Sequence, residues 1–349
     1  MLPIIIENPA ITNVNRRQSM AHDPEPRWKS EMAAAFSSPE DLLGYLGLPL
    51  DLPLADSELV RCFPLRVTAA FASRMKKGDP HDPLLLQVLP LAEELVERVG
   101  YVADPVGDLP AAAVPGLLHK YHGRALLITT GACAINCRYC FRREFPYADG
   151  QLSRSRVAEA LAHIAKDGSI DEVILSGGDP LMLDDGRLAV LVQGLAAIPH
   201  VSRLRIHSRL PIVLPSRISP DLAQILAGTR LKPVLVVHAN HANEFDAEVA
   251  RALLVLRSAG VVLLNQSVLL QGVNDNVETL CGLSATLFNY GVLPYYLHLL
   301  DKARGTAHFD IPETTALALC QELRRRLPGY LVPKLVREIA GAPYKISLL

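Results

Sequence analysis

The sequence of 349 residues lacks the features that mark membrane, secreted and nucleic-acid-binding proteins. No apolar run reaches the roughly 18 residues that a membrane-spanning helix needs, and the apolar residues 1–6 follow no basic segment. Its charges nearly cancel, with 35 Lys and Arg against 36 Asp and Glu, so the whole chain does not attract nucleic-acid phosphates or anionic lipids. We therefore expect a soluble, cytoplasmic protein with no nucleic-acid partner and no membrane partner.

Cysteine is also scarce, and its distribution argues against a disulfide framework. Six cysteines occur in the whole chain, and three of them fall within residues 133–140. In a cytoplasmic protein this clustering indicates a metal or iron–sulfur site. What is abundant is apolar: hydrophobic residues make up 50% of the chain and charged residues 20%, a balance that excludes a disordered protein.

The chain divides into three parts by composition. Residues 1–37 are polar and contain prolines, so we expect a tail and N-terminal segment that is partly flexible. Residues 38–113 contain leucine-rich stretches with helical spacing, at 41–46 and 84–99, which predict a helical N-terminal subdomain. Residues 114–349 have a different texture and are expected to form the main α/β domain.

In that main domain, short β-branched runs alternate with amphipathic stretches of helical length. The expected strands are 124–130, 171–176, 203–207, 234–238, 261–269 and 294–299, and the expected helices are 154–167, 186–197, 219–227, 244–259, 276–290 and 313–327. This pattern predicts a parallel sheet covered by helices, either doubly wound or rolled into a full or partial barrel. In such folds the functional residues gather at the carboxyl ends of the strands.

The three clustered cysteines lie directly after the first of these strands. Cys133, Cys137 and Cys140 can hold three irons of a [4Fe–4S] cluster and leave the fourth iron open to another ligand. A structural zinc loop is the alternative, with His122 as the fourth ligand. The C-x3-C-x2-C spacing after a strand, followed by Phe141, resembles the signature of radical S-adenosylmethionine (SAM) enzymes. That resemblance implies that the open iron binds SAM, which is cleaved to a 5′-deoxyadenosyl radical.

A glycine turn follows the second expected strand. Its residues are Ser176, Gly177, Gly178 and Asp179, and the glycines allow the backbone to approach a ligand closely. In radical SAM enzymes a similar turn receives the amino group of SAM, so the resemblance assigns these four residues to cofactor binding.

Beyond these motifs, the chain resembles the lysine 2,3-aminomutase family over roughly residues 60–345. The resemblance rests on Cys140-Phe141-Arg142-Arg143 and on the segments 114–121, 205–212, 265–270 and 294–301. Within the family, the chain is most similar to the branch that serves β-lysylation of elongation factor P. The implied fold is a radical SAM partial (β/α)6 barrel with a helical N-terminal subdomain.

The family resemblance implies an isomerase that moves the α-amino group of L-lysine to C3 and so makes β-lysine. Its members use SAM, a [4Fe–4S] cluster and pyridoxal 5′-phosphate (PLP). The implied partners are a reductant protein such as flavodoxin or ferredoxin, elongation factor P and the lysine ligase that acts on it.

The same resemblance assigns roles to individual residues. Lys345 would hold PLP as a Schiff base, Arg142 would bind the substrate carboxylate, and Asp301 and Glu338 would bind the substrate ammonium. Glu338 stands where family members carry an aspartate. The remaining cofactor residues are Lys120, Tyr121 and Arg124 for PLP, and His238 and Gln266 for SAM.

Two alternatives stay open from the sequence. The same chemistry could act on another cationic amino acid or on a lysyl group attached to protein. An acidic substrate is disfavoured, because the Asp301 carboxylate would repel it. The alternative of a different class is a non-catalytic iron–sulfur sensor or binding module.

Overall fold

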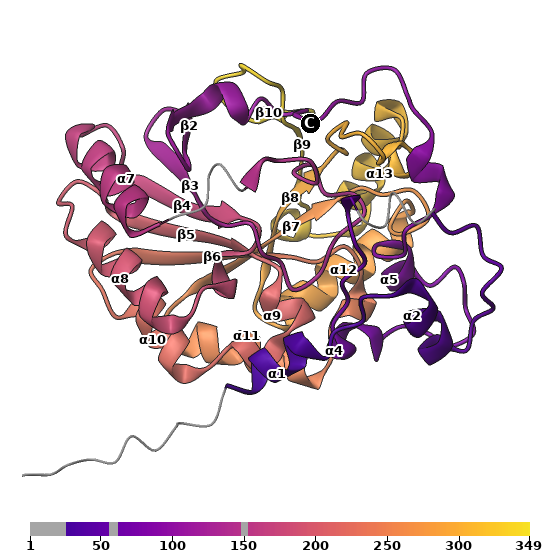
Figure 1. The fold of residues 1–349 in the computed structure, drawn as a ribbon. Coiled ribbons are helices and arrows are strands. Elements are labelled where there is room, and N and C mark those ends of the chain that lie inside the picture. The colour runs from indigo at the N-terminus through magenta and orange to yellow at the C-terminus, as the bar shows by residue number, and fades with distance from the viewer. Residues whose placement is uncertain (1–25, 56–61, 148–152) are drawn as a thin grey trace, which may run out of the picture.

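The computed structural model describes residues 26–55, 62–147 and 153–349, and its centre is one ten-stranded sheet. The strands follow one another in the sheet in chain order, and neighbours from β3 to β9 run parallel. Antiparallel pairs flank this block, with β1 and β2 on one side and β10 on the other. The strands are β1 (Ala112–Val114), β2 (Leu117–Tyr121), β3 (Arg124–Thr130), β4 (Glu172–Gly177), β5 (Arg203–Ser208), β6 (Lys232–His238), β7 (Val262–Val268), β8 (Leu293–His298), β9 (Lys334–Arg337) and β10 (Ile346–Ser347). The observed fold is a mixed α/β structure with a mostly parallel, open sheet (Figure 1).

A helix follows each of the six strands from β3 to β8. These covering helices are α7 (Arg154–Lys166), α8 (Asp185–Ala196), α10 (Pro220–Ala227), α11 (Ala247–Ser258), α12 (Val277–Asn289) and α13 (Glu313–Arg326). The six strands and six helices expected from the sequence are therefore confirmed to within a few residues. The flanking strands β1, β2, β9 and β10 were not expected, because they are short and three of their pairings are antiparallel.

Local capping explains where most of these helices begin. Every covering helix except α13 starts after a polar residue whose side chain accepts a backbone N–H of the first turn. These caps are Ser153, Asp184, Ser219, Asp246 and Asn276. Each such cap stabilises a helix by about 1 kcal/mol.

The strands alternate between two environments. Val173 and Leu175 on β4, like Leu204 and Ile206 on β5, are buried in the core under the helices. The residues between them face the other side of the sheet, where a cavity lies. Period-two alternation thus separates residues that stabilise the fold from residues that are free to do chemistry.

The N-terminal part is less helical than the sequence predicted. Its described elements are α1 (Arg27–Ala33), α2 (Pro39–Leu46), α4 (Ala69–Ala72), α5 (Pro83–Leu86) and the 3-10 turns η1 (Ala92–Leu95) and η2 (Leu109–Ala111). The expected helix over 84–99 is wrong, because only α5 and η1 form there. Pro90 disfavours helical backbone at the residue before it and lacks the N–H that a continuing helix needs.

The N-terminal helices share a core with the sheet. Leu42, Leu84 and Phe71 belong to the same buried cluster as Leu127 and Val213 of the main domain. In Figure 1, α1 and α4 lie beside α9 (Leu210–Val213) and α11, and α2 and α5 lie farther to the right. The expected flexible tail falls largely on residues 1–25, which lie outside the described residues. Within the part that the structure describes, no helix is both long and apolar enough to cross a membrane.

Candidate active site

A cavity of about 320 Å³ opens at the carboxyl ends of the parallel strands. Its volume is within the range of small-molecule sites. Every site residue expected from the sequence lines it: Lys120, Tyr121, Arg124, Cys133, Cys137, Cys140, Arg142, Ser176, Gly177, Gly178, Asp179, His238, Gln266, Asp301, Glu338 and Lys345. Segments more than 200 residues apart in the sequence therefore contribute to one site.

The three cysteines lie on the loop after β3, as expected, and their thiols border this cavity. Burial raises the pKa of Cys133, and burial together with Cys137 raises that of Cys140 to about 11. Among the described residues, no three His, Cys, Asp or Glu side chains converge on a point where one metal ion could bind. A [4Fe–4S] cluster spreads its thiolate ligands over separate irons, and three thiols on one loop beside the cavity match a cluster that keeps one iron open.

The glycine turn after β4 packs directly on the cysteine loop. Gly177 has φ +118°, and a Cβ at this position would meet the carbonyl oxygen of Thr130 at 2.7 Å. A Cβ on Gly178 would collide with the backbone at Ala132. The glycines are thus required by close approach to the cysteine loop itself, in addition to any ligand.

The Asp179 carboxylate has a structural role in this turn. Its oxygens accept hydrogen bonds from Ser208 Oγ at 2.8 Å and from the backbone N–H groups of Leu181, Arg209 and Leu210 at 2.7–3.2 Å. A carboxylate has about four acceptor positions, and all four are used here. Burial nevertheless raises the pKa of Asp179 to about 6. The side chain holds the turn against β5.

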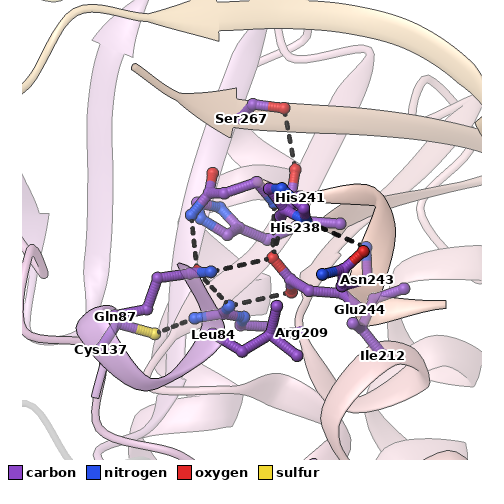
Figure 2. Close-up of polar contacts among 12 residues, drawn as sticks. Leu84, Gln87, Cys137, Arg209, Ile212, His238, His241, Asn243, Glu244 and Ser267 are labelled. Atoms are coloured by element: carbon purple, nitrogen blue, oxygen red, sulfur yellow. Dashed lines mark hydrogen bonds and ion pairs between the residues drawn. The ribbon is translucent and has the colours of Figure 1, made fainter. Parts of the chain in front are cut away.

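A buried polar network lies next to Cys137 (Figure 2). Arg209, one residue after β5, donates from Nη1 to Cys137 Sγ at 2.7 Å and to Tyr139 Oη at 2.8 Å. Tyr139 Oη also lies 2.9 Å from His238 Nε2, at the end of β6. Burial, followed by the charge of Arg209, lowers the pKa of His238, so this imidazole is neutral at physiological pH. A neutral His238 can accept or donate one hydrogen bond to a ligand in the cavity.

A chain of alternating charges crosses the cavity from the cysteine loop to the C-terminal strands. Arg142 donates from Nε to Asp108 Oδ2 at 2.6 Å, and Lys120 Nζ lies 2.5 Å from Asp108 Oδ1. Lys120 also donates to Glu338 Oε1 at 3.1 Å, and Lys345 donates to Glu338 Oε2. Burial raises the pKa of Glu338, but the ammonium groups of Lys345 and Lys120 outweigh it and lower that pKa to about 2.

The antiparallel pair β9–β10 explains why Lys345 and Glu338 meet. Arg337 at the end of β9 is paired with Ile346 at the start of β10, so Glu338, just after β9, and Lys345, just before β10, face each other. This short pairing fixes Lys345 in the cavity wall although the strand has only two residues.

Asp301 is the other carboxylate at this end of the cavity. It follows β8 and, unlike Glu338, has no lysine or arginine within ion-pair distance in the described structure. Burial, reinforced by the charge of Glu338, raises the pKa of Asp301 to about 7. The site is therefore short of one cation beside Asp301.

Several buried donors on the cavity wall have no partner within the described residues. They are Nε of Arg124 on β3, Nε of Arg205 and Nε2 of His207 on β5, and Nε of Arg209. An unsatisfied buried donor costs about 1–3 kcal/mol, so such groups are typical of a site completed by a ligand. The two arginines and the histidine on β3 and β5 suit an anionic group such as a phosphate.

Comparison with known proteins places the chain in a family. A model described as the radical SAM superfamily matches residues 127–282. The chain is 50% identical over 322 residues to the L-lysine 2,3-aminomutase of Escherichia coli strain K12, covering 92% of this chain and 94% of that protein. The chain belongs to the lysine 2,3-aminomutase family.

Two further relatives in this family differ in their sequence identity to the chain. The L-lysine 2,3-aminomutase of Haemophilus influenzae is 48% identical over 92% of this chain and 95% of its own length. That of Clostridium subterminale is 34% identical over 96% of this chain and 82% of its own length. Membership in this aminomutase family makes the chain an enzyme of the isomerase class, and its radical SAM segment implies a [4Fe–4S] cluster and SAM. The resemblance seen in the sequence is thereby confirmed.

Some residues of this aminomutase site were missed in the sequence. Asp108, Arg205, His207 and Arg209 all line the cavity, and Glu244 supports Arg209 from behind. The signal for two of them was present, since Arg205 and His207 alternate with apolar residues along an otherwise apolar strand. Asp108 had no signal, because it lies in an irregular loop before β1 and meets Arg142 only through the fold.

Proposed function

We propose that this enzyme is an L-lysine 2,3-aminomutase that uses SAM, a [4Fe–4S] cluster and PLP to convert L-lysine to β-lysine. The observation that carries the proposal is one cavity lined by the three cysteines, by Lys345 and by the acidic pair Asp301 and Glu338. When bound, the cluster and SAM supply a 5′-deoxyadenosyl radical, and PLP supplies the conjugated system through which an amino group can migrate.

Arg142 suits the substrate carboxylate. It is buried, and its guanidinium is oriented by Asp108 on one edge and by Ser176 Oγ at 3.2 Å on another. A guanidinium fixed in this way offers its remaining N–H groups to a planar anion. Its place two residues after Cys140 would hold the α-carbon end of an amino acid close to the cluster.

Asp301 suits the substrate ammonium. Its pKa of about 7 indicates a buried carboxylate without an ion-pair partner among the described residues, and the ammonium of lysine would supply one. Glu338 adds a second negative charge nearby, although it is already paired with Lys345 and Lys120. A cationic side chain is therefore favoured at this end, and an acidic one is repelled.

The residues suited to PLP form two groups: the lysine that would bind its aldehyde, and the arginines that would bind its phosphate. Lys345 is a partly buried amine whose carboxylate partner Glu338 holds it in the cavity wall, as a Schiff-base lysine requires. Arg124 and Arg205 have unpartnered Nε atoms that suit the phosphate. Lys120 was expected there too, but all three of its donors are used, by Val106 O, Asp108 and Glu338. We assign Lys120 to orienting these carboxylates instead.

The remaining assignments follow the family resemblance. Tyr121 lies under Arg124, with the guanidinium 4.9 Å from the ring centroid, and would contact PLP from the same side. Gln266 at the end of β7 would join His238 in contacting SAM. The product would serve β-lysylation of elongation factor P together with its lysine ligase, and a flavodoxin or ferredoxin would supply the electron.

The test is an anaerobic assay of the holoenzyme. Protein reconstituted with iron, sulfide and PLP receives SAM, dithionite and L-lysine, and β-lysine is measured by chiral chromatography. We expect β-lysine from the wild type, none from Lys345→Ala, and normal amounts from Lys334→Ala, which removes an exposed lysine on β9. SAM cleavage without β-lysine would overturn lysine as the substrate and favour another cationic amino acid or a lysylated protein. Loaded cluster without SAM cleavage would favour the sensor alternative.

A further inference from the structure

Arg209 makes a contact that neither SAM nor substrate binding explains. Its Nη1 donates to the Sγ of Cys137, one of the three cysteines of the cluster loop, at 2.7 Å (Figure 2). The guanidinium is nearly inaccessible, at 7% exposure. A buried, positively charged donor therefore lies against the sulfur of a cysteine.

The other edge of Arg209 is held by two acceptors from distant segments. Nη2 donates to Gln87 Oε1 at 2.7 Å and to Glu244 Oε2 at 3.0 Å. Glu244 is fully buried, and its second oxygen accepts the backbone N–H groups of Asn240 and His241 at 2.8 and 3.1 Å. This carboxylate is fixed by the chain around it, so it fixes the guanidinium in turn.

The placement has an electrostatic consequence for an iron–sulfur cluster. Reduction adds one electron and one negative charge to the cluster, and hydrogen bonds and positive charge at its sulfurs stabilise that added charge. The effect is strong here because the surroundings of Arg209 are buried and screen charge poorly. Glu244 weakens this stabilisation of the reduced cluster, because its negative charge lies on the far side of the same guanidinium.

We propose that Arg209 is a positioning residue that raises the one-electron reduction potential of the cluster through its hydrogen bond to Cys137, and that Glu244 limits this rise. The inference rests on the cluster of the proposed function and needs neither PLP nor lysine. The electron comes from a low-potential reductant such as dithionite, and the oxidised cluster accepts it while Arg209 stays protonated.

The test is a redox titration of the reconstituted holoenzyme without SAM, followed by the electron paramagnetic resonance signal of the reduced cluster. We expect Arg209→Gln to lower the midpoint potential and Glu244→Gln to raise it. Each shift should change the reduced-to-oxidised ratio at a fixed potential by about tenfold, which is 59 mV for one electron. Arg209→Lys keeps the charge with fewer donors, so its shift should lie between those of wild type and Arg209→Gln.

Arg217→Gln is the matched control. Arg217 is also a buried arginine paired with a carboxylate, that of Asp185, but its contacts are with α8 and with backbone carbonyls at Leu181 and Leu183. The midpoint potential of the cluster in Arg217→Gln should equal that in the wild type. If Arg209→Gln fails to load iron, Arg209→Lys and Glu244→Gln carry the test.

Unchanged potentials, or shifts of the same sign in the arginine and glutamate variants, would overturn the inference and leave Arg209 as a structural link between α5 and the cysteine loop. The readout is independent of turnover. A failure of β-lysine formation with shifted potentials would count against the proposed function alone.

Discussion

The two ends of the cavity differ in how far the protein satisfies its own polar groups. At the cysteine end, Asp179 has all its acceptor positions filled, and Arg209 is held by Gln87, Glu244 and Tyr139. At the lysine end, Asp301 has no cation beside it, and the arginines at the start of β3 and in β5 keep unpartnered Nε atoms. Apart from the Nε of Arg209, the polar groups named at the cysteine end are satisfied before any ligand binds, whereas those at the lysine end are completed by ligands.

This difference matches the chemistry proposed for each end. An iron–sulfur cluster benefits from a rigid surrounding that fixes its potential and geometry. PLP and the substrate are charged molecules taken up from solution, and the groups that bind them become fully paired only in the complex, because that pairing contributes to their affinity. Substitutions at the two ends should therefore fail in different ways.

Loss of a cluster ligand should give the largest effect. Cys140→Ser should retain the fold, since serine is nearly isosteric, but it should lose most of its iron and all measurable SAM cleavage because one iron loses its thiolate. Iron and sulfide content after anaerobic reconstitution measures this, with Cys320→Ser, a buried cysteine far along the chain in α13, as the control. A Cys140→Ser protein that loads iron normally would contradict the assignment of the loop.

Loss of the proposed carboxylate-binding guanidinium should come next. Arg142→Gln should raise the KM for lysine by about 100-fold or more, because removing one partner of a buried charged pair costs about 2–5 kcal/mol. Iron content and the spectrum of bound PLP should remain those of the wild type. Steady-state kinetics measures the change, and an unchanged KM would place the substrate carboxylate elsewhere.

The pH dependence of lysine binding should report on Asp301. Its pKa of about 7 means that the carboxylate is charged above that pH and neutral below it, while the side-chain amine of lysine stays protonated throughout. The KM for lysine should therefore rise about tenfold between pH 8 and pH 6. Asp301→Asn should have a high KM that no longer changes over this range, and a parallel pH profile in the two proteins would contradict the role of Asp301.

The contrast between the ends also separates what the sequence could and could not predict. The cysteine end could be predicted from the sequence because its residues lie in one loop and in turns directly after strands. Residues that are close along the chain there are also close in space. Strand and helix positions in the main domain were readable for a similar reason, since each β–α unit repeats one local pattern.

The lysine end depends on pairings that are distant in sequence. Lys120 meets Glu338 across 218 residues, and the two-residue strand β10 is too short to leave a periodic signal. Family resemblance named these residues, but only the fold shows that Lys120 has no donor left for a phosphate. In the N-terminal part, leucine spacing over 84–99 suggested a helix, and Pro90 prevented it.

The smallest effect should come from replacing Glu338 by the shorter aspartate. Removing one methylene lengthens the contacts to Lys120 and Lys345 but keeps a negative charge between the two ammonium groups, so these mostly buried ion pairs are weakened and not lost. Glu338→Asp should therefore change kcat/KM for lysine by less than tenfold, whereas Glu338→Gln should lower it further because Lys345 loses its partner. Steady-state kinetics of both variants with saturating PLP measures this. Equal losses in the two variants would mean that reach, rather than charge, is what Glu338 contributes to the lysine end.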